Sequence, residues 1–391
     1  MNSFIRLPAP LVFTMPLIFL FNKQQENIFS QRFYYTKEMF VFLMGAILLF
    51  LIALQSIKSF LVVLIIVGCC IMYFNYFIGK DIKKLTLSIW MFYALLLLSS
   101  VIMLLDHLNP VQITALRSML LGEVAKQTPS GIAPYIFTFG YQLSALVSFA
   151  VISAICFRKH ILIIVIVFGL SLVLILYGMN RSVLVTFSLS VGLFWILYYR
   201  FKALLFVGIL ICFGLLFRSS IEDLSTGRKE NILAKNEKNA DEHRESLMIE
   251  NFKIIADNPF GLAFYGKSWT DVAKRNPAFR LGFEGIVTSH NAYLMFITYL
   301  GIVVGGLFLW LFYQKIASIF WRALLHIRKR ENALMISLCF SFLAISLNSF
   351  FHNEWLLAGS GPTIFLYFCI MQLSKIQNSP ESLNPTSAGN H

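Results

Sequence analysis

Arg181 combines reactive chemistry with an unusual position. It lies in the connection Tyr177–Ser182, which is only a few residues long and joins two strongly apolar runs. An arginine at the centre of a membrane helix costs about 2.5–3.5 kcal/mol, so it usually faces a polar cavity and has a partner there. Its guanidinium could bind an anionic group such as a phosphate through paired hydrogen bonds. We predict a functional role for Arg181; the alternative is an interfacial arginine whose side chain reaches to the membrane surface.

Two further residues complete the candidate set. Arg244 stands near the predicted start of an amphipathic helix, and helix N-termini favour anions. His290 lies where a long polar segment enters an apolar run, and an imidazole near neutral pH suits proton transfer. Arg244 could instead be a solvated charge beside Glu245, and His290 a simple helix-start residue. We predict Arg181, Arg244 and His290 as the catalytic residues.

Other polar side chains could contact a substrate. His352 begins a second His-Asn pair, in the segment His352–Trp355; the alternative for this segment is an interfacial turn with an aromatic anchor. Glu284 and the pair Asp106-His107 are weaker candidates. The predicted substrate-binding residues are Asn291, Tyr293, Arg280, Lys267 and His352.

Several motifs that define enzyme classes are absent from the sequence. It contains no HExxH, GxSxG, CxxC or DxD pattern. The cysteines all fall in apolar runs without metal-ligand or disulfide spacing, which indicates small apolar fillers. We therefore predict no cofactor, no dedicated metal and no use of a nucleotide.

The composition sets the class of protein. Of 391 residues, 58% are hydrophobic and 13% are charged, and the mean hydropathy is +0.74. Soluble chains are about 45–50% apolar and about 25% charged. A soluble enzyme, a disordered protein and a disulfide scaffold are excluded. The net charge of +13 is explained by basic cytoplasmic loops rather than by nucleic acid.

Long apolar runs recur along the chain. A spanning helix needs roughly 20 mainly apolar residues, so the runs predict an all-α polytopic membrane protein, a bundle of about 11–12 transmembrane helices. The shorter, proline-interrupted run 7–21 is doubtful as a span. The secure runs are 39–57, 59–79, 85–105, 135–157, 161–179, 182–199, 202–217, 291–313, 333–351 and 354–373.

These runs define the domain organisation. N-terminal transmembrane helices occupy 1–217, a long polar loop 218–290, C-terminal transmembrane helices 291–373 and a disordered cytoplasmic tail 374–391. Lysine and arginine collect in alternate connections, which places those connections in the cytoplasm and the long loop outside. The side on which the N-terminus lies stays open.

The long loop contains one clear helical pattern. Residues His243–Asp257 read as an amphipathic helix in which Met248, Phe252 and Ile255 repeat at helical spacing. Asn239 with Glu242 offers a start resembling a capping box, and Asn258-Pro259 stops the helix. Gly261 and Gly266 then allow tight turns.

Three features now occur in a recognisable order. An arginine begins a span in Asn180-Arg181-Ser182, a loop holds Arg244 and the segment Asn258–Gly266, and Ser289–Leu294 leads into the next span. This order resembles the O-antigen ligase and polymerase superfamily of bacterial envelopes, whose members typically read Ser-Arg-Gly, Arg…Asn-Pro…Gly-x-Gly and His-Asn-x-Tyr-Leu. The resemblance covers about residues 170–310. Val183 follows Ser182 where the family has a small residue, and the loop glycines are more widely spaced.

The resemblance implies a reaction and a location. Such enzymes sit in the bacterial inner membrane as multi-pass proteins with a periplasmic active site, and act in lipopolysaccharide biosynthesis. They move a glycan from an undecaprenyl-pyrophosphate-linked donor to an acceptor hydroxyl. The expected partners are these glycan substrates and membrane lipid, and no nucleic acid. Ligases use the lipid A-core as acceptor, and polymerases use another lipid-linked repeat unit. We expect a ligase first and a polymerase second, although Ser289 stands where many ligases have a further histidine.

Physical chemistry gives each candidate a role in this glycosyltransferase reaction. Pyrophosphate is a good leaving group, so no ATP site is needed. Arg181 and Arg244 would stabilise the departing charge, and His290 would act as general base on the attacking hydroxyl or orient it. A direct displacement would invert the anomeric centre. This scheme requires the three side chains to converge in one pocket that opens away from the cytosol.

Two alternatives belong to other classes. A transporter of lipid-linked glycans would favour two related halves with broken helices near the membrane midplane. The sequence shows no such symmetry, and its candidate charges cluster at one outer face. A structural membrane scaffold is the remaining alternative.

Overall fold

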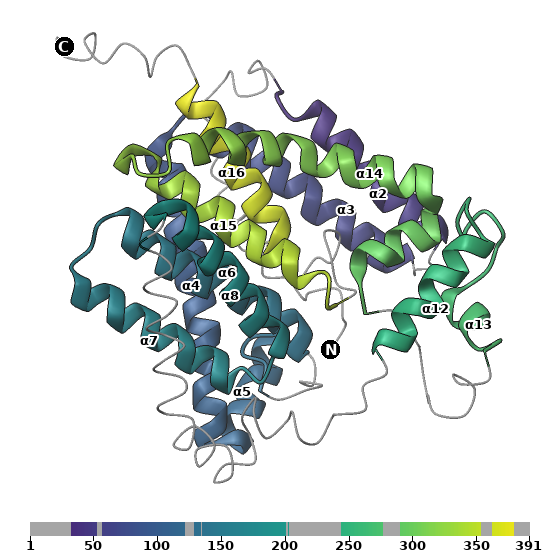
Figure 1. Cartoon of the computed structure of the whole chain (residues 1–391), viewed down its shortest axis with the longest axis horizontal. Coiled ribbons are helices and arrows are strands. Elements are labelled where there is room, and N and C mark those ends of the chain that lie inside the picture. Colours follow the sequence, from purple (N-terminus) through teal and green to yellow (C-terminus); the bar gives the residue numbers. More distant parts are fainter. Residues whose placement is uncertain are drawn as a thin grey trace. The chain divides into compact units, whose positions relative to one another are not determined.

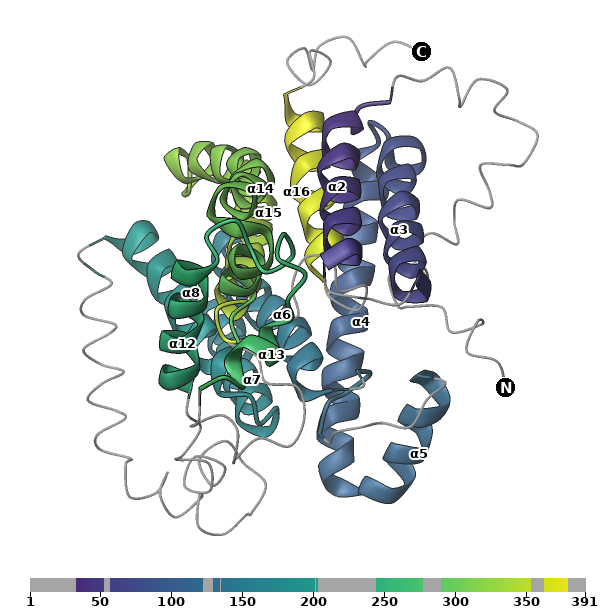
Figure 2. The ribbon, with the colours of Figure 1, turned by 90° about the vertical axis from the view of Figure 1, so that its right-hand side faces the viewer.

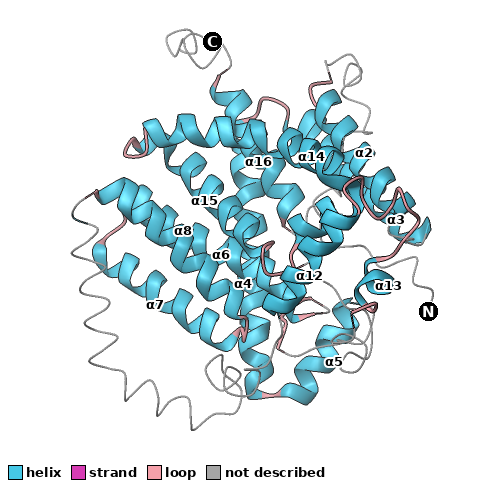
Figure 3. Cartoon of the chain, turned by 45° about the vertical axis from the view of Figure 1, so that its right-hand side comes forward, coloured by secondary structure: helices cyan, strands magenta, loops and turns pink. Residues whose placement is uncertain are grey.

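The computed structural model describes residues 33–52, 57–121, 129–133, 135–200, 202, 244–276, 290–352 and 362–378. Every regular element in these ranges is helical (Figure 3). The elements are α2 (Thr36–Ile52), α3 (Ile57–Met72), η3 (Tyr73–Ile78), α4 (Ile82–Leu108), α5 (Pro110–Leu121), α6 (Ile136–Cys156), α7 (Ile161–Tyr177), α8 (Arg181–Tyr199), α12 (Arg244–Asp257), α13 (Trp269–Ala273), α14 (Ala292–Leu325), η5 (Arg330–Asn332), α15 (Ala333–Asn348) and α16 (Thr363–Gln377).

The all-helical membrane fold predicted from the sequence is confirmed. Within the described ranges, five helices are long and apolar enough to cross a membrane. They are Ile82–Leu108, Ile136–Cys156, Arg181–Tyr199, Ala292–Leu325 and Arg330–Asn348. Two shorter apolar helices, Leu64–Ile78 and Ile161–Tyr177, coincide with further predicted runs. The predicted run 7–21, the predicted run 202–217 apart from Lys202, the capping residues Asn239 and Glu242, and the tail after Asn378 lie outside the described residues.

The chain divides into two compact units, each discontinuous in sequence. The first contains Tyr93–Ser246 and Arg322–Glu354; the second contains Leu7–Phe92, Leu247–Trp321 and the chain from Trp355 onward. We describe each by itself. The boundaries at 217, 290 and 373 concern membrane topology and stay a prediction.

Helix α6 is the centre of the first unit. It packs against α7, α8 and α15 (Figure 1). Of its most apolar stretch of 18 residues, 94% is buried inside the protein. Two successive hydrogen bonds between small polar side chains join α6 to α8. The hydroxyls of Ser144 and Thr186 are 3.2 Å apart, and Ser190 donates to Ser148 over 3.1 Å. Small residues let helices approach closely in a membrane, and their hydroxyls then bond across the interface.

The basic connections of the first unit meet at one end of this bundle. Arg328 donates from Nε and Nη2 to the carbonyl oxygen of Tyr198 over 2.9 and 2.7 Å. Arg158 donates from Nη2 to the carbonyl oxygen of Arg328 over 3.4 Å. The end of α6, the end of α8 and the start of α15 therefore lie together. The grouping agrees with the sequence-based expectation that these connections share one side of the membrane.

In the second unit, α2, α3 and α16 lie side by side (Figure 2). Aromatic rings fill the space between these helices and α14. Phe42 is 1% exposed and its ring contacts Phe312, Tyr367 and Phe368 at centroid separations of 5.6–5.7 Å. Such edge and offset contacts add stabilisation beyond the area they bury.

Helix α14 folds back on itself at Gly301. Its backbone there has φ 80° and ψ 165°, which is not helical. The rings of Phe296 and Phe308 stack at 5.4 Å, whereas twelve residues of a continuous helix would separate them by about 18 Å. The predicted run 291–313 is thus helical on both sides of Gly301, but the chain reverses at that residue. A glycine inside the apolar run supplies the conformation that the reversal requires.

The loop helix α12 has the predicted extent but a different buried face. It runs from Arg244 to Asp257 and ends before Asn258-Pro259, as expected. Leu247, Asn251 and Ile254 are buried. Of the predicted repeat, Ile255 is buried, whereas Met248 and Phe252 are 40% and 54% exposed. The difference has a physical cause: the side chain of Asn251 donates to Thr298 of α14 and accepts from Trp269 of α13 and from Thr298. A hydropathy pattern does not recognise a buried polar residue of this kind.

Candidate functional site

Arg181 is the first residue of α8, and the preceding turn fixes its position. Helix α7 ends at Tyr177 and is followed by the cap residue Gly178, Met179 adopts a left-handed φ of 50°, and Asn180 returns to extended backbone. The side-chain oxygen of Asn180 accepts a hydrogen bond from the backbone N–H of Ser182 over 3.2 Å. This is an N-cap, which explains why the helix begins here. Arg181, half-buried, therefore stands at a helix N-terminus, a position that favours anions.

Ser182 connects this helix start to His352. Its hydroxyl lies 2.6 Å from Oδ1 of Asn180 and 2.9 Å from Nε2 of His352, and also donates to Oδ1 of Asn348. One hydroxyl proton cannot serve two amide oxygens and a ring nitrogen at once. Nε2 of His352 is therefore best placed as the donor to the hydroxyl oxygen, which leaves its Nδ1 as an acceptor. We call Asn180, Ser182, Asn348 and His352 the polar cluster.

Asn348 was not singled out from the sequence. It is the last residue of α15 and is fully buried. Its side-chain nitrogen has no hydrogen-bond partner among the described parts of the chain. A buried donor left unsatisfied costs about 1–3 kcal/mol, and a 180° turn of this amide would let Nδ2 donate to the hydroxyl of Ser182. The sequence feature that could have identified Asn348 is an asparagine near the end of an apolar run.

A buried ion pair stabilises the same end of the first unit. Arg117, 0% exposed, donates from Nη1 to Oδ2 of Asp106 over 3.0 Å and from Nε to the carbonyl oxygen of Gly131 over 2.7 Å. Burial lowers the pKa of Arg117, and the carboxylate of Asp106 opposes this shift. Asp106, a weak candidate in the sequence, is thus the counter-charge of a buried arginine. His107 contacts the carbonyl oxygen of Tyr177 at 2.9 Å.

In the second unit, the segment Asn258–Ala263 binds the turn of α14. The backbone N–H groups of Leu262 and Ala263 donate to the carbonyl oxygens of Thr298 and Tyr299 over 2.9 and 3.2 Å. The N–H of Ile302 donates to the carbonyl oxygen of Pro259 over 3.1 Å. Backbone groups exposed by the reversal are thereby satisfied.

Two glycines make this contact possible. Gly261 has φ 95°, and a Cβ there would lie 2.3 Å from the backbone nitrogen of Gly301. A Cβ on Gly301 would lie 2.5 Å from the carbonyl carbon of Phe260. The predicted tight turns at Gly261 and Gly266 are confirmed by their positive φ. Gly261 and Gly301 thus allow the loop to pack against the helix that follows His290.

His290 lies immediately before α14. Its backbone has a left-handed φ of 50°, which is uncommon for a residue other than glycine. Asn291 caps the helix, because its Oδ1 accepts from the N–H of Leu294 over 3.1 Å. The hydroxyl of Tyr293 is 2.9 Å from that of Tyr313, across the α14 hairpin. The cap and the hairpin together hold His290 at a defined helix start.

The remaining predicted residues have varied surroundings. Nζ of Lys267 lies 3.4 Å from Oδ1 of Asn258 and 5.3 Å from the ring centre of Tyr265. Helix α12 begins at Arg244, as expected. Arg280 lies outside the described residues.

The candidates fall in both units. Arg181 and His352 belong to the first unit, where Ser182 joins them, and the backbone of Arg244 also belongs there. His290, Asn291, Tyr293 and Lys267 belong to the second unit. Convergence of the three catalytic candidates in one pocket stays a prediction. No group of three or more metal-ligating side chains occurs among the residues that the structure describes.

Comparison with known proteins gives one match. Residues 163–311 match the family model described as O-antigen ligase. The matched range contains Arg181, Arg244, His290 and both glycines of the Gly261–Gly301 contact, whereas Asn348 and His352 follow it. No curated protein and no solved structure matches the chain. The match confirms the resemblance to the O-antigen ligase and polymerase superfamily.

Proposed function

From this membrane protein's match to the O-antigen ligase family, we propose that the chain transfers a glycan from undecaprenyl pyrophosphate to the lipid A-core. The reaction takes place at the periplasmic face of a bacterial inner membrane. The observation that carries the proposal is the start of α8, where Arg181 stands at a capped helix N-terminus beside the bonded pair Ser182–His352. Cationic groups at a helix N-terminus suit a diphosphate.

The reaction first requires stabilisation of the leaving group. As the bond between the anomeric carbon and the diphosphate oxygen breaks, negative charge develops on the diphosphate. Arg181 and the N-terminus of α8 stabilise this charge, and Arg244 at the start of α12 contributes a second guanidinium.

The reaction also requires removal of a proton from the acceptor hydroxyl. His290 removes the proton of the acceptor hydroxyl while its oxygen attacks the anomeric carbon, and the diphosphate departs with the bonding electrons. One displacement of this kind inverts the anomeric centre. The cap by Asn291 supports this role, because it fixes the backbone next to His290.

The basic loops support the proposed sidedness. Arg158 and Arg328 contact each other at one end of the first unit, and the polar cluster lies at the other end of α8 and α15. Connections rich in lysine and arginine face the cytoplasm. The polar cluster then faces the periplasm, where the lipid-linked donor is presented.

The lipopolysaccharide pattern of a deletion strain separates ligase from polymerase. Loss of a ligase leaves bare core, and loss of a polymerase leaves core plus one repeat unit. We expect bare core. A strain with the normal ladder would contradict both activities.

Complementation of that strain tests the residues. Removal of one charge-stabilising donor is expected to lower transfer roughly 100- to 1,000-fold, so Arg181→Ala should not restore the ladder and Arg181→Lys should restore part of it. His290→Ala should also fail. The matched controls are Arg330→Ala and His326→Ala, which change exposed residues at the basic end. Full complementation by Arg181→Ala or His290→Ala in membrane-inserted form would refute the assigned role.

A further inference from the structure

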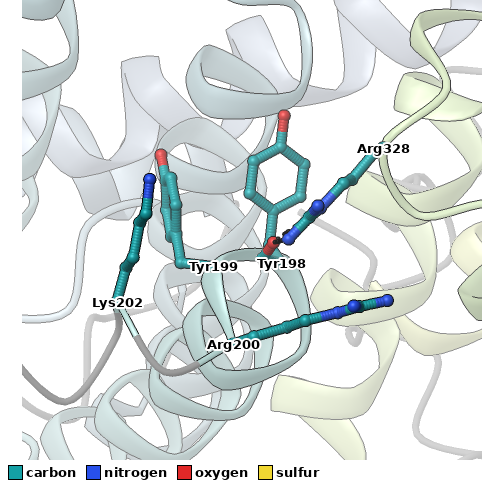
Figure 4. A pocket seen from close by; sticks show the side chains of 5 residues that line it. All are labelled: Tyr198, Tyr199, Arg200, Lys202 and Arg328. Carbon is teal, nitrogen blue, oxygen red and sulfur yellow. Dashed lines mark hydrogen bonds between the residues drawn. The ribbon is translucent and has the colours of Figure 1, made fainter.

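A basic pocket lies at the opposite end of the first unit from the polar cluster. Figure 4 shows its five lining side chains, which come from the end of α8, the residues after it and the connection before α15. They are Tyr198, Tyr199, Arg200, Lys202 and Arg328, around a volume of about 440 Å³. Three of the five are cationic, and none is acidic. The pocket therefore has an unbalanced positive charge.

Backbone hydrogen bonds fix the walls of this pocket. Arg200 caps the C-terminus of α8 with a left-handed φ of 56°, and its N–H donates to the carbonyl oxygen of Ile196 over 2.9 Å. Arg328 binds the carbonyl oxygen of Tyr198 through Nε and Nη2. Such a cation offsets the partial negative charge of a helix C-terminus. Arg328 is thus held in place, while its Nη1 takes no part in these two bonds.

The proposed sidedness puts this pocket at the depth of the lipid headgroups. Helix α8 is one of the helices that can cross a membrane, and Tyr198 and Tyr199 are its last residues. Tyrosines at the end of a membrane helix lie at the interface, and lysine and arginine follow on the cytoplasmic side. Arg200 and Lys202 are exposed beyond the tyrosines. Phosphate groups of the inner leaflet are the nearest abundant anions at such a position.

We propose that this pocket binds the phosphate group of an anionic phospholipid from the cytoplasmic leaflet. Arg200, Lys202 and Arg328 supply the positive charge that attracts the phosphate, and the two tyrosines flank the glycerol part of the headgroup. A volume of this size holds a small ligand. Inorganic phosphate shares the same chemistry. Basic pockets beside transmembrane helices on the cytoplasmic side bind anionic headgroups in general.

The experiment uses the full chain purified in a neutral detergent. Its thermal unfolding is followed during separate titrations with phosphatidylglycerol, phosphatidylcholine and inorganic phosphate. Each cation near a headgroup contributes roughly fivefold to affinity, so Arg200→Gln/Lys202→Gln should weaken phosphatidylglycerol binding roughly 30-fold. Lys80→Gln/Lys83→Gln removes the same charge from exposed positions in a different loop and should bind like the unchanged protein.

The single variant Lys202→Gln guards against a folding defect, because it alters an exposed side chain and should lose roughly fivefold in affinity. Equal binding by the unchanged protein and Arg200→Gln/Lys202→Gln would overturn the proposal. An equal response to phosphatidylcholine would also overturn it. Stabilisation by inorganic phosphate as strong as that by phosphatidylglycerol would reject the lipid as the occupant.

Discussion

The replacement Gly261→Ala tests how the loop is attached to α14. Gly261 has φ 95°, and the added methyl carbon would lie 2.3 Å from the nitrogen of Gly301 and 2.4 Å from the carbonyl oxygen of Tyr299. Both neighbours are backbone atoms, so no side-chain movement relieves the overlap. The segment that contains Gly261 must separate from the turn of α14.

The free-energy cost of Gly261→Ala has two parts, backbone strain and lost hydrogen bonds. A left-handed backbone costs a residue with a side chain roughly 1–2 kcal/mol. Separation also breaks the two hydrogen bonds from Leu262 and Ala263 to α14, each worth about 0.5–1.5 kcal/mol. Gly261→Ala therefore reduces the free energy of attachment by about 2–5 kcal/mol relative to the unchanged protein.

Amide hydrogen exchange measures this loss locally. The amides of Leu262 and Ala263 should exchange roughly 30- to 5,000-fold faster in Gly261→Ala, because exchange reports the free energy of local opening. Gly266→Ala is the matched control: Gly266 also has a positive φ, 62°, but nothing lies within 4 Å of the added carbon. Equal exchange in the two variants would refute the close contact between Gly261 and Gly301.

The remaining predictions concern the ion pair, the helix cap and metal dependence. Arg117→Met should cost about 3–5 kcal/mol in denaturant unfolding, because it leaves Asp106 buried without a counter-charge; adding Asp106→Asn should recover most of the loss, and no recovery would contradict the pairing. Asn291→Ala should destabilise the start of α14 by about 1 kcal/mol, measured by exchange at Leu294, whereas Asn291→Asp keeps the capping oxygen. Glycan transfer should survive EDTA, since the sequence has no metal-binding motif; strict metal dependence would contradict the scheme.

The helical architecture was predictable because composition and helix-stop signals act locally. The end of α12 before Asn258-Pro259 and the start of α8 at Arg181 both follow from residues next to the boundary. The reversal at Gly301 was not predictable from hydropathy. The apolar run continues through it, and the turn depends on backbone contacts with Pro259 and Leu262, which lie far away in the sequence.

Some residues of the candidate site were predictable from the sequence, and others were not. Arg181 was recognisable because a charge inside an apolar stretch needs a reason to be there. Asn348 and Arg117 were missed, since an amide at a helix end and an arginine in a polar connection are ordinary in sequence. Their importance comes from burial and from partners distant in the chain, such as Ser182 and Asp106.

Reconstituted transfer tests the central claim most directly. The purified chain in proteoliposomes receives a labelled glycan on undecaprenyl pyrophosphate, and the label is followed with and without lipid A-core. We predict label on the acceptor and release of one undecaprenyl pyrophosphate per glycan moved, with Arg181→Ala and His290→Ala lowering the rate at least roughly 100-fold. Movement of the labelled lipid across the bilayer without acceptor, and no label on lipid A-core, would contradict the account.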